Sequence, residues 1–352
     1  MSGSLNKVGV LLLSVWLSGC ASFGHTTIER DHLDYGMAFH DATKKQLLNN
    51  IVRLRYLEAP VFVDVSSVIN QYALIGRMDA ALGTSNALIG GDTANLGGSG
   101  QWEDRPTITY TPVSGRAFAE SLLTPIDPEA LFALVQSGWP AELMFRLTVS
   151  SMNGVRDANR GERQADPEYR KALGAWKRLR DDRAIGLRRT VIDEKKVASI
   201  LVYIDDTSTS PQRQADIAYI REVFRLNPDK KEYVLKYGLV PDKDDQIAVM
   251  TQSVLEIVLD LAWQVDVPDE HIQDGRTKPT FVDSGEGGPL FKVRYSEEKP
   301  EDAFTAIWDR GYWFYIDDRD MVTKRTFGVL QILLSLTESG RGGKGPVVTI
   351  GG

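Results

Sequence analysis

The sequence predicts an α+β fold that combines helices with a mainly antiparallel sheet. Hydrophobic residues make up 42% and charged residues 25% of the 352 positions, which is the composition of a folded globular chain. The second half mixes strand-like and helix-like segments without the regular alternation or the glycine fingerprint of a nucleotide-binding sheet. Residues 61–111 add a stretch of period-two alternation followed by glycine-rich sequence, which predicts a long glycine-rich hairpin or loop.

The first twenty residues have the layout of an export signal. Lys7 ends a short polar leader, and an apolar run from Val8 to Leu17 precedes two small residues. This run of about ten residues is roughly half the length that spans a membrane as a helix. The sequence LSGC at 17–20 resembles the lipobox of bacterial lipoproteins.

The lipobox resemblance implies that residues 1–19 are a signal peptide and that Cys20, the only cysteine, carries a diacylglycerol. Two or three acyl chains, palmitate among them, would hold the chain stably at a membrane, whereas a single chain binds reversibly. Ala21 follows the cysteine in place of an aspartate, which in enteric-like lipoproteins implies an outer-membrane anchor facing the periplasm. The competing interpretations are a chance cysteine after an ordinary cleaved signal and a buried cysteine in an uncleaved helix.

Charge and motif content exclude several classes of partner and site. With 48 acidic and 41 basic residues the formal net charge is −7, so no overall positive field draws the chain to nucleic acid. A single cysteine rules out a disulfide framework, a thiolate zinc cluster and a CxxC redox site. The glycine-rich segments at 97–101 and 342–346 match neither a nucleophile elbow nor a phosphate-binding loop, so we expect no cofactor.

Residues 20–40 lack apolar periodicity and are expected to form a polar tether. They contain three of the four histidines, whose spacings match no zinc motif, so no metal site is expected there. A helix is then predicted from residue 42 to about residue 58, with Asp41 as its N-cap and Pro60 after its end. Its apolar positions recur at helical spacing at Leu47, Leu48, Ile51, Leu54 and Leu57.

The predicted hairpin is the most unusual part of the chain. From Tyr72 to Leu82 the even positions are apolar or glycine, whereas the odd positions include Arg77 and Asp79. After a turn-like GTSN the chain returns through glycine-rich sequence, where Asp92 would share a face with apolar residues and weaken a lipid-facing assignment. One interpretation is a hairpin whose apolar face packs on the chain's own helices. The alternative is a pore, because such a strand can cross a membrane when several copies close the sheet.

A strand-then-helix unit follows the glycine-rich sequence. The run RPTITYTP at 105–112, followed by SGRAFAESLLTPI, resembles a unit of an uncharacterised family of proteobacterial lipoproteins, from which no activity is carried over. Pro106 and Pro112 bracket the strand and suit an edge position, and Ser114 is placed to cap the helix.

Three more helices are predicted before the second half. Residues 127–152 predict two short helices, the first capped by Asp127 and the second opened by Pro140, and polar residues 153–165 predict a joint. Another helix begins at Asp166. Its apolar stripe is Tyr169, Leu173, Trp176 and Leu179, beside a basic flank of Lys171, Lys177, Arg178 and Arg180. The flank could bind an anionic envelope polymer, although such a run is usually a solvated face.

The remaining elements complete the predicted organisation. Strands are expected from residues 197, 232 and 244 and at 291–295, 312–316 and 347–350, with helices near 212–226, from 254 and near 320–337. The expected units are a signal peptide at 1–19, a tether at 20–40, a helix and hairpin subdomain at 41–155, a linking helix at 156–185 and an α+β subdomain at 186–352.

Two pairs of adjacent aspartates are candidates for a ligand or ion site. Asp205 and Asp206 end one predicted strand, and Asp317 and Asp318 end another. Paired carboxylates at strand ends can bind a cation or serve acid–base catalysis. Turn and helix-capping duty is the competing role, because adjacent residues of a strand point to opposite faces. His271 follows VPDE and is expected to be solvated in a polar loop.

Three functions are compatible with these observations. The first is a lipid-anchored periplasmic or outer-membrane protein without catalytic residues, acting as a structural or interaction module of an envelope assembly. Its partners would be envelope proteins or further copies of the chain. The second is an envelope hydrolase or polymer-binding protein that uses the four aspartates. The third is an oligomeric outer-membrane pore formed by the 61–111 hairpin.

Overall fold

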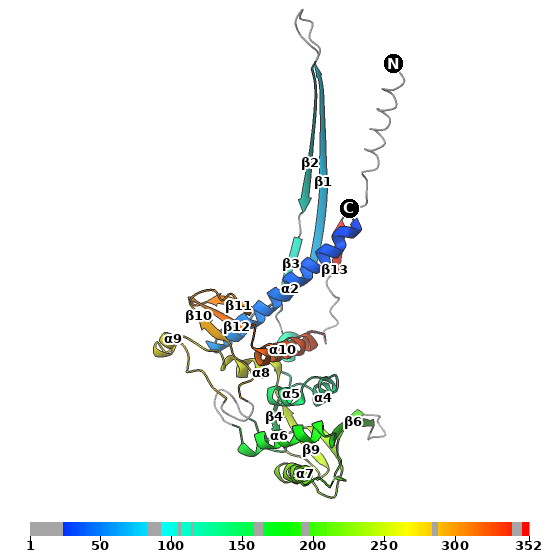
Figure 1. Cartoon of the computed structure of the whole chain (residues 1–352), viewed down its shortest axis with the longest axis vertical. Coiled ribbons are helices and arrows are strands. Elements are labelled where there is room, and N and C mark those ends of the chain that lie inside the picture. Colours follow the sequence, from blue (N-terminus) through cyan, green and yellow to red (C-terminus); the bar gives the residue numbers. More distant parts are fainter. Residues whose placement is uncertain are drawn as a thin grey trace, which may run out of the picture.

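The computed structural model describes residues 24–83, 93–104, 107–113, 116–157, 165–191, 198–207, 209–283, 288–339 and 347–351. These residues form an α+β fold, as the sequence predicts, with sheets whose strand pairs are mostly antiparallel. The molecule is elongated, and a long hairpin projects from a body of helices and two further sheets (Figure 1).

Helix α2 (Gly24–Arg55) begins well before the expected start near residue 42. Most of the expected tether at 20–40 is therefore helical, and Asp41 is an interior residue that pairs with Lys44 at 2.8 Å instead of capping the helix. The reason is that a helix extends at little cost once packing holds one part of it. That packed part lies near the end of α2, where the buried residues are Leu47, Leu48, Asn50, Ile51, Val52, Leu54 and Arg55.

The end of α2 fixes the foot of the hairpin. The helix stops at Arg55, and Leu57 follows with a left-handed φ of 61°, which turns the chain. The Asn50 amide then donates to the carbonyl of Val61 and accepts from its backbone N, both at 2.9 Å. The backbone N of Val63 donates to the Gln46 side chain at 3.1 Å. These bonds hold the first residues of the next strand against the helix.

Strand β1 (Phe62–Gly83) is 22 residues long and forms the spine of a four-stranded sheet. Its first part pairs antiparallel with β3 (Thr107–Val113) and in parallel with β13 (Val347–Gly351). Its distal part pairs antiparallel with β2 (Thr93–Asp104). The segment is thus a hairpin, the last strand returns to a sheet as predicted, and β3 pairs with β1 alone among the described strands, as its prolines suggested.

Among the described residues, the hairpin beyond its foot does not pack on the helices of the chain, contrary to one sequence-based expectation. The main partners of β1 are the strands β2, β3 and β13, and beyond its foot the hairpin extends away from the body (Figure 1). The physical reason is length, because twelve paired residues extend about 40 Å beyond the foot. GTSN, Asp92, Pro106 and Ser114 lie wholly or partly outside the described residues.

Three short helices follow the hairpin: α3 (Arg116–Leu123), α4 (Pro128–Gln136) and α5 (Ala141–Thr148). Pro128 begins α4 and Pro140 precedes α5, as predicted. The expected helix around Met152 ends earlier, at Thr148, because the next four residues form strand β4 (Val149–Met152) and pair with a distant strand.

A six-stranded sheet forms the lower part of the body in Figure 1. Its order is β5-β4-β9-β8-β7-β6, and only the β8–β9 pair is parallel. The strands are β5 (Val155–Arg156), β6 (Ile185–Val191), β7 (Ala198–Ile204), β8 (Glu232–Tyr237) and β9 (Gln246–Thr251). They come from both sides of the boundary expected at residue 155, so the sheet joins segments that the sequence pattern separates.

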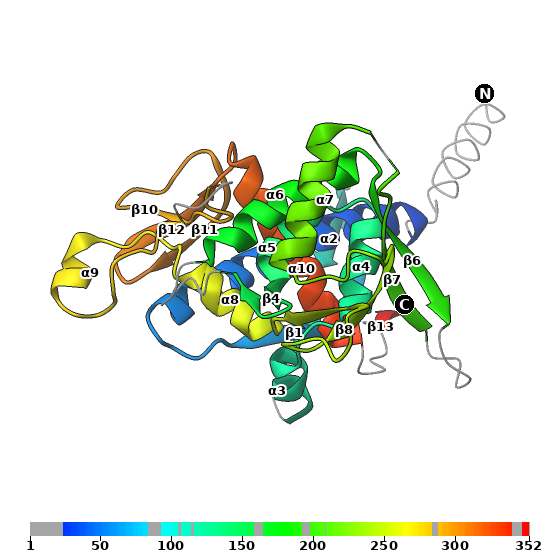
Figure 2. The same cartoon turned by 90° about the horizontal axis from the view of Figure 1, so that it is seen from below.

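Two helices accompany this sheet and pack against each other (Figure 2): α6 (Pro167–Asp181) and α7 (Pro211–Val223). The predicted start of α6 at Asp166 is confirmed, since Asp166 is its N-cap. The predicted apolar stripe is also confirmed, because its four residues are buried: Tyr169, Leu173, Trp176 and Leu179.

A three-stranded sheet of order β10-β12-β11 lies nearer the hairpin (Figure 1). Its strands are β10 (Arg294–Ser296), β11 (Ala303–Asp309) and β12 (Tyr312–Asp317). The neighbouring helices are α8 (Val254–Ala262), α9 (Asp269–Gln273) and α10 (Met321–Ser339). The helix predicted near 320–337 is confirmed, and α10 contributes the buried residues Phe327, Val329, Leu330 and Leu333 to the core.

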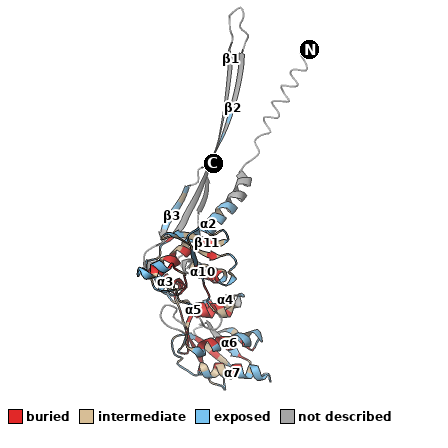
Figure 3. Cartoon of the chain, turned by 60° about the vertical axis from the view of Figure 1, so that its left-hand side comes forward, coloured by how far each residue is buried: buried red, intermediate tan, exposed pale blue. Residues whose placement is uncertain are grey.

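One hydrophobic cluster runs through the body, from Leu47 of α2 to Leu333 of α10 (Figure 3). A buried ionic cluster lies within it. Asp283 accepts from Arg146 of α5 at 3.2 Å and from Arg170 of α6 at 3.1 Å, and Arg170 also donates to Asp157 at 2.8 Å. Buried charges are tolerated where each is paired in this way.

Candidate functional site

The predicted lipidation site, Cys20, precedes the described residues, which begin at Gly24. The anchor therefore stays a prediction from the lipobox. The remaining predicted site residues, the four aspartates, all lie in the described part of the chain.

Asp205 and Asp206 follow strand β7 and make turn and ion-pair contacts. The Asp205 carboxylate accepts from the backbone N of Thr207 at 3.1 Å and from its hydroxyl at 2.7 Å, and it pairs with Arg213 at 2.7 Å. Asp206 pairs with Lys231 at 2.9 Å and with an arginine of α7. Hydrogen bonds from Thr207 lower the pKa of Asp205, with Arg213 adding to the effect. The hydrogen bond from Lys231 lowers the pKa of Asp206.

Asp317 and Asp318 end strand β12 and make contacts of the same kind. One oxygen of Asp317 accepts from the backbone N of Arg319 at 2.9 Å, and the other pairs with Arg294 at 3.2 Å. Asp318 pairs with Lys324 of α10 at 2.6 Å. This second pair therefore closes a turn and ties the strand to the following helix.

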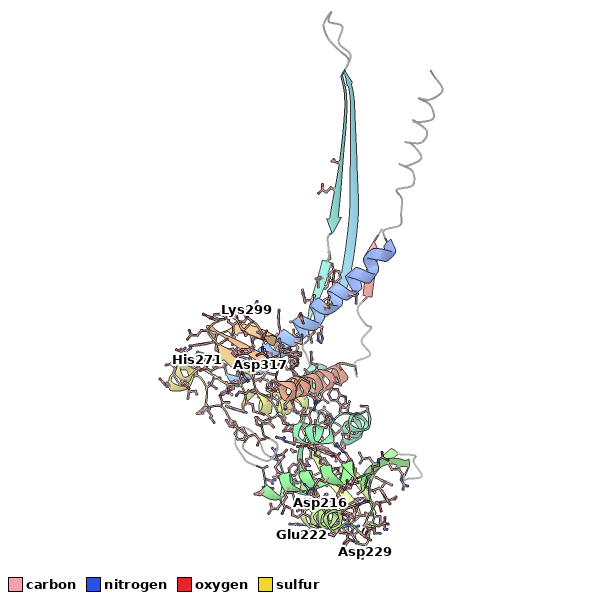
Figure 4. All side chains as sticks on the ribbon, viewed as in Figure 1. Asp216, Glu222, Asp229, His271, Lys299 and Asp317 are labelled. Atoms are coloured by element: carbon pink, nitrogen blue, oxygen red, sulfur yellow. The ribbon has the colours of Figure 1, made fainter. Side chains whose placement is uncertain are left out.

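The four aspartates do not form one site. The first pair follows a strand of the six-stranded sheet and the second follows a strand of the three-stranded sheet. Figure 4 shows Asp317 far from Asp216 of α7, the helix whose arginines bind the first pair. General acid catalysis needs a carboxyl group with a raised pKa, whereas the pKa values of Asp205 and Asp206 are lowered. The contacts fit turn and ion-pair roles.

The basic flank of α6 is also engaged within the chain. Lys177 pairs with Glu142 at 2.8 Å, and Arg178 pairs with Asp216 at 2.7 Å. Arg180 pairs with the neighbouring Asp181, and Lys171 lies over the ring of Tyr219. This arrangement is that of a surface whose charges are matched locally, and it provides no strip of unmatched cations for a polymer.

His271 is buried, so the expectation of a solvated loop histidine is wrong. It lies in α9, and its Nδ1 is 2.6 Å from the hydroxyl of Tyr56 beyond the end of α2. The ring of Tyr312 meets the imidazole edge-on, with 5.6 Å between centroids. Burial, and then Arg276, lower the pKa of His271, so the neutral imidazole is favoured. Burial also raises the pKa of Tyr56 to about 12. These partners are distant in sequence, so no local pattern reveals them.

A hollow of about 310 Å³ lies between α2 and β11. Its lining includes Lys44, Lys45, Lys299, Phe304 and Trp313. Lys44 lies 4.8 Å from the centre of the Phe304 ring and also pairs with Asp41, and Lys299 lies 5.7 Å from that of Trp313. Lys44 and Lys299 thus already interact with side chains of the chain itself. For this reason the charges that line the hollow do not favour one class of ligand.

In the part of the chain that the structure describes, the distal hairpin has two outer strand edges that no strand covers beyond Gln71. Strands β1 and β2 pair through twelve residue pairs that end at Gly83↔Thr93. Within the described ranges, β13 covers the outer edge of β1 only from Ser67 to Gln71, and no strand covers the outer edge of β2. Exposed edges of this length are templates for pairing with another chain, and folded proteins usually shield them. The hairpin is therefore the candidate functional site.

The register gives the hairpin one apolar and one mainly polar face. Residues directly opposite in an antiparallel ladder share a face, and even positions of β1 lie opposite even positions of β2. The first face has the pairs Leu74↔Trp102, Gly76↔Gly100, Met78↔Gly98, Ala80↔Leu96 and Leu82↔Ala94. The second has Ile75↔Gln101, Arg77↔Ser99, Asp79↔Gly97, Ala81↔Asn95 and Gly83↔Thr93. Asp92, which the sequence pattern assigns to the first face, lies outside the described residues.

Among the described residues, no group of three or more His, Cys, Asp and Glu side chains could hold a metal ion. No helix in this part of the chain has the length and apolarity needed to span a membrane. Comparisons with protein-family models, with curated proteins and with solved structures each found no match.

Proposed function

We propose that the chain is a subunit of a cell-envelope assembly in which copies of the chain join side by side through their hairpins. The observation that supports this most directly is the pair of open edges on the distal hairpin. Both edges belong to the same ladder of twelve residue pairs, so they are equal in length. A single copy leaves the backbone groups of both edges without strand partners.

The two edges are complementary between copies. When neighbouring copies point the same way, β2 of one copy runs antiparallel to β1 of the next, which allows a regular ladder. The contact uses a different edge on each side of a copy, so it is heterologous and can close into a ring. Because β13 covers β1 from Ser67 to Gln71, pairing between copies would begin beyond Gln71.

The predicted lipid anchor would favour this assembly. A diacylglycerol on Cys20 would confine the copies to one membrane surface with the same orientation. Confinement raises the effective concentration of one hairpin edge around another, and a common orientation is what head-to-tail pairing requires. The lipobox and the hairpin therefore support the same function, that of a lipid-anchored structural module at the outer membrane.

The test is disulfide formation between copies of the full-length chain. One version, carrying an affinity tag, has Arg77→Cys on β1. It is co-expressed with a larger version that has a cysteine on β2, introduced in turn as Asn95→Cys, Gly97→Cys, Ser99→Cys and Gln101→Cys. We expect one or two of these combinations to give a mixed disulfide dimer after mild oxidation, which would also give the register between copies.

Strand spacing provides the controls. Adjacent strands lie about 4.8 Å apart, whereas β1 strands of neighbouring copies would lie about 10 Å apart, beyond the roughly 7 Å limit for Cα atoms in a disulfide. Each single variant alone should therefore give no dimer. Glu222→Cys on α7, exposed and at the far end of the body (Figure 4), is a further negative control, and the unsubstituted chain accounts for Cys20. Absence of all mixed dimers, or dimers from Arg77→Cys alone, would rule out head-to-tail pairing.

A further inference from the structure

We propose that the assembled hairpins cross a lipid bilayer as a closed ring of strands and surround a water-filled passage. This inference rests on the proposed function, because it needs the edge-to-edge assembly. It adds a partner of defined chemistry, the hydrocarbon layer of a membrane, and an activity, the passage of small hydrophilic solutes.

The paired length of the hairpin matches a membrane. A strand that crosses the hydrocarbon layer at a tilt of about 45° needs about 9 to 11 residues. The distal hairpin has twelve residue pairs, from Tyr72↔Asp104 to Gly83↔Thr93. At about 3.3 Å per residue this is about 40 Å of strand, or about 28 Å of depth at that tilt. The pairing therefore continues through the whole thickness that lipid would cover.

The two faces of the ladder match the two environments of such a ring. Strands that cross a membrane alternate between lipid-facing apolar residues and polar residues that face the interior. On the first face every pair from Leu74↔Trp102 to Leu82↔Ala94 consists of apolar residues or glycine. Arg77 and Asp79 both fall on the second face. The register places the apolar positions of both strands on the same face. The sequence alone did not determine this alignment.

The aromatic residues of the first face lie at one end of the ladder. Tyr72 and Trp102 belong to its first and third pairs, counted from the body. Tyr and Trp are enriched where membrane-spanning strands leave the hydrocarbon layer. Their position places the membrane interface near the foot of the free hairpin and the body outside the hydrocarbon layer.

The open edges explain why the activity requires assembly. Within lipid every backbone donor and acceptor must be paired inside the protein, so a lone hairpin cannot cross. A closed ring leaves no edge. Membrane-spanning rings contain at least about eight strands, so with two distal strands per copy a ring would need about four copies or more.

The first experiment maps the two faces in a bilayer. Full-length chain, extracted in detergent, is reconstituted into vesicles of phosphatidylethanolamine and phosphatidylglycerol. Single cysteines replace residues of the first face (Leu74→Cys, Met78→Cys, Leu82→Cys) or of the second face (Ile75→Cys, Arg77→Cys, Asp79→Cys). We expect a water-soluble thiol reagent to label the first-face cysteines at no more than about one tenth of the rate for the second-face cysteines, because the reactive thiolate is disfavoured in hydrocarbon. The unsubstituted chain accounts for labelling at Cys20.

The second experiment measures the passage itself. The same preparation is added to planar bilayers, where we expect discrete conductance steps. Asp79→Asn removes one negative charge per copy from the second face and should shift the reversal potential in a salt gradient toward anions. Glu222→Gln, at an exposed position of α7 at the far end of the body (Figure 4), also removes one negative charge per copy and should leave both conductance and selectivity unchanged.

The outcomes separate this inference from the function on which it rests. Equal labelling of both faces in vesicles, without conductance but with mixed disulfide dimers, would overturn the pore and leave the assembly. Loss of the mixed dimers as well would overturn both.

Discussion

At the scale of single residues, His271 and Tyr56 form a hydrogen-bonded pair although 215 positions separate them in the chain. Their contact connects α9 to the end of α2, next to the turn that leads into the hairpin. The imidazole is buried, and its pKa is lowered chiefly by that burial. Protonation in acid would therefore place a charge in a site that favours the neutral ring.

We expect the free energy of unfolding to fall in mild acid because of His271. Its pKa in the folded chain is below the ordinary 6.5, so the unfolded state binds more protons once the pH falls below about 6.5. The stabilisation is present above that pH and is lost as the pH falls toward the folded-state value. Urea titrations between about pH 7.5 and 5 should show a steeper loss for the wild type than for His271→Gln. His40→Gln, at an exposed position, is the matched control, and equal slopes for wild type and His271→Gln would contradict the expectation.

At the scale of single elements, α8 begins with a reciprocal capping arrangement. The Ser253 hydroxyl accepts from the backbone N of Glu256 at 3.3 Å, and the Glu256 carboxylate accepts from the backbone N of Ser253 at 2.7 Å. Two backbone N–H groups without helical partners are thus satisfied. Since α8 contributes Val254, Ile257, Val258 and Leu261 to the core, its start also determines how the body packs.

Removing this cap should cost about 1 kcal/mol of the free energy of unfolding in Ser253→Ala. Ser210→Ala at the N-cap of α7 is the matched control, because Ser210 makes no side-chain cap hydrogen bond. Urea denaturation of both variants measures the difference. A loss in Ser253→Ala no greater than in Ser210→Ala would show that the cap does not stabilise α8.

At the scale of the whole molecule, the hairpin and the body are stabilised in different ways. The body has one hydrophobic cluster and buried ion pairs. Beyond Gln71 the hairpin has only the ladder between its own two strands among the described residues. An isolated two-stranded hairpin is marginal in water, and in the proposed assembly the neighbouring copies would complete its ladder.

Shortening the hairpin should leave the body folded and abolish assembly. Residues 74–102 are replaced by Asn-Gly, which joins the opposed residues Ala73 and Glu103 by a two-residue turn. We expect a melting temperature within a few degrees of the wild type, because the removed segment projects away from the body (Figure 1). Circular dichroism and light scattering provide the measurements. Unfolding of the body, or an oligomer of unchanged size, would contradict this separation of roles.

Local sequence patterns predicted an element correctly where its residue types repeat with the period of a helix or a strand. Residues that are neighbours in the chain predicted the stripe on α6, the helix near 320–337 and the alternation in β1. They also predicted the starts of α4, α5 and α6, where prolines lie. The same patterns failed for α2, whose mostly exposed residues 33–40 continue into a packed second half. They also failed for Met152, which joins a sheet whose partner strand lies about one hundred positions away.

What the sequence by itself determined is the α+β class, the principal helices and strands and the alternation in β1, because propensity and periodicity act between nearby residues. The resemblance of residues 17–20 to a lipobox predicts lipidation of Cys20. Only the tertiary structure decided that β1 and β2 align their apolar positions, that β13 covers one edge of β1 and that the hairpin leaves the body. It also decided that His271 is buried and that the aspartate pairs lie apart. Register, burial and convergence depend on contacts between segments distant in the chain, and no local period specifies these contacts.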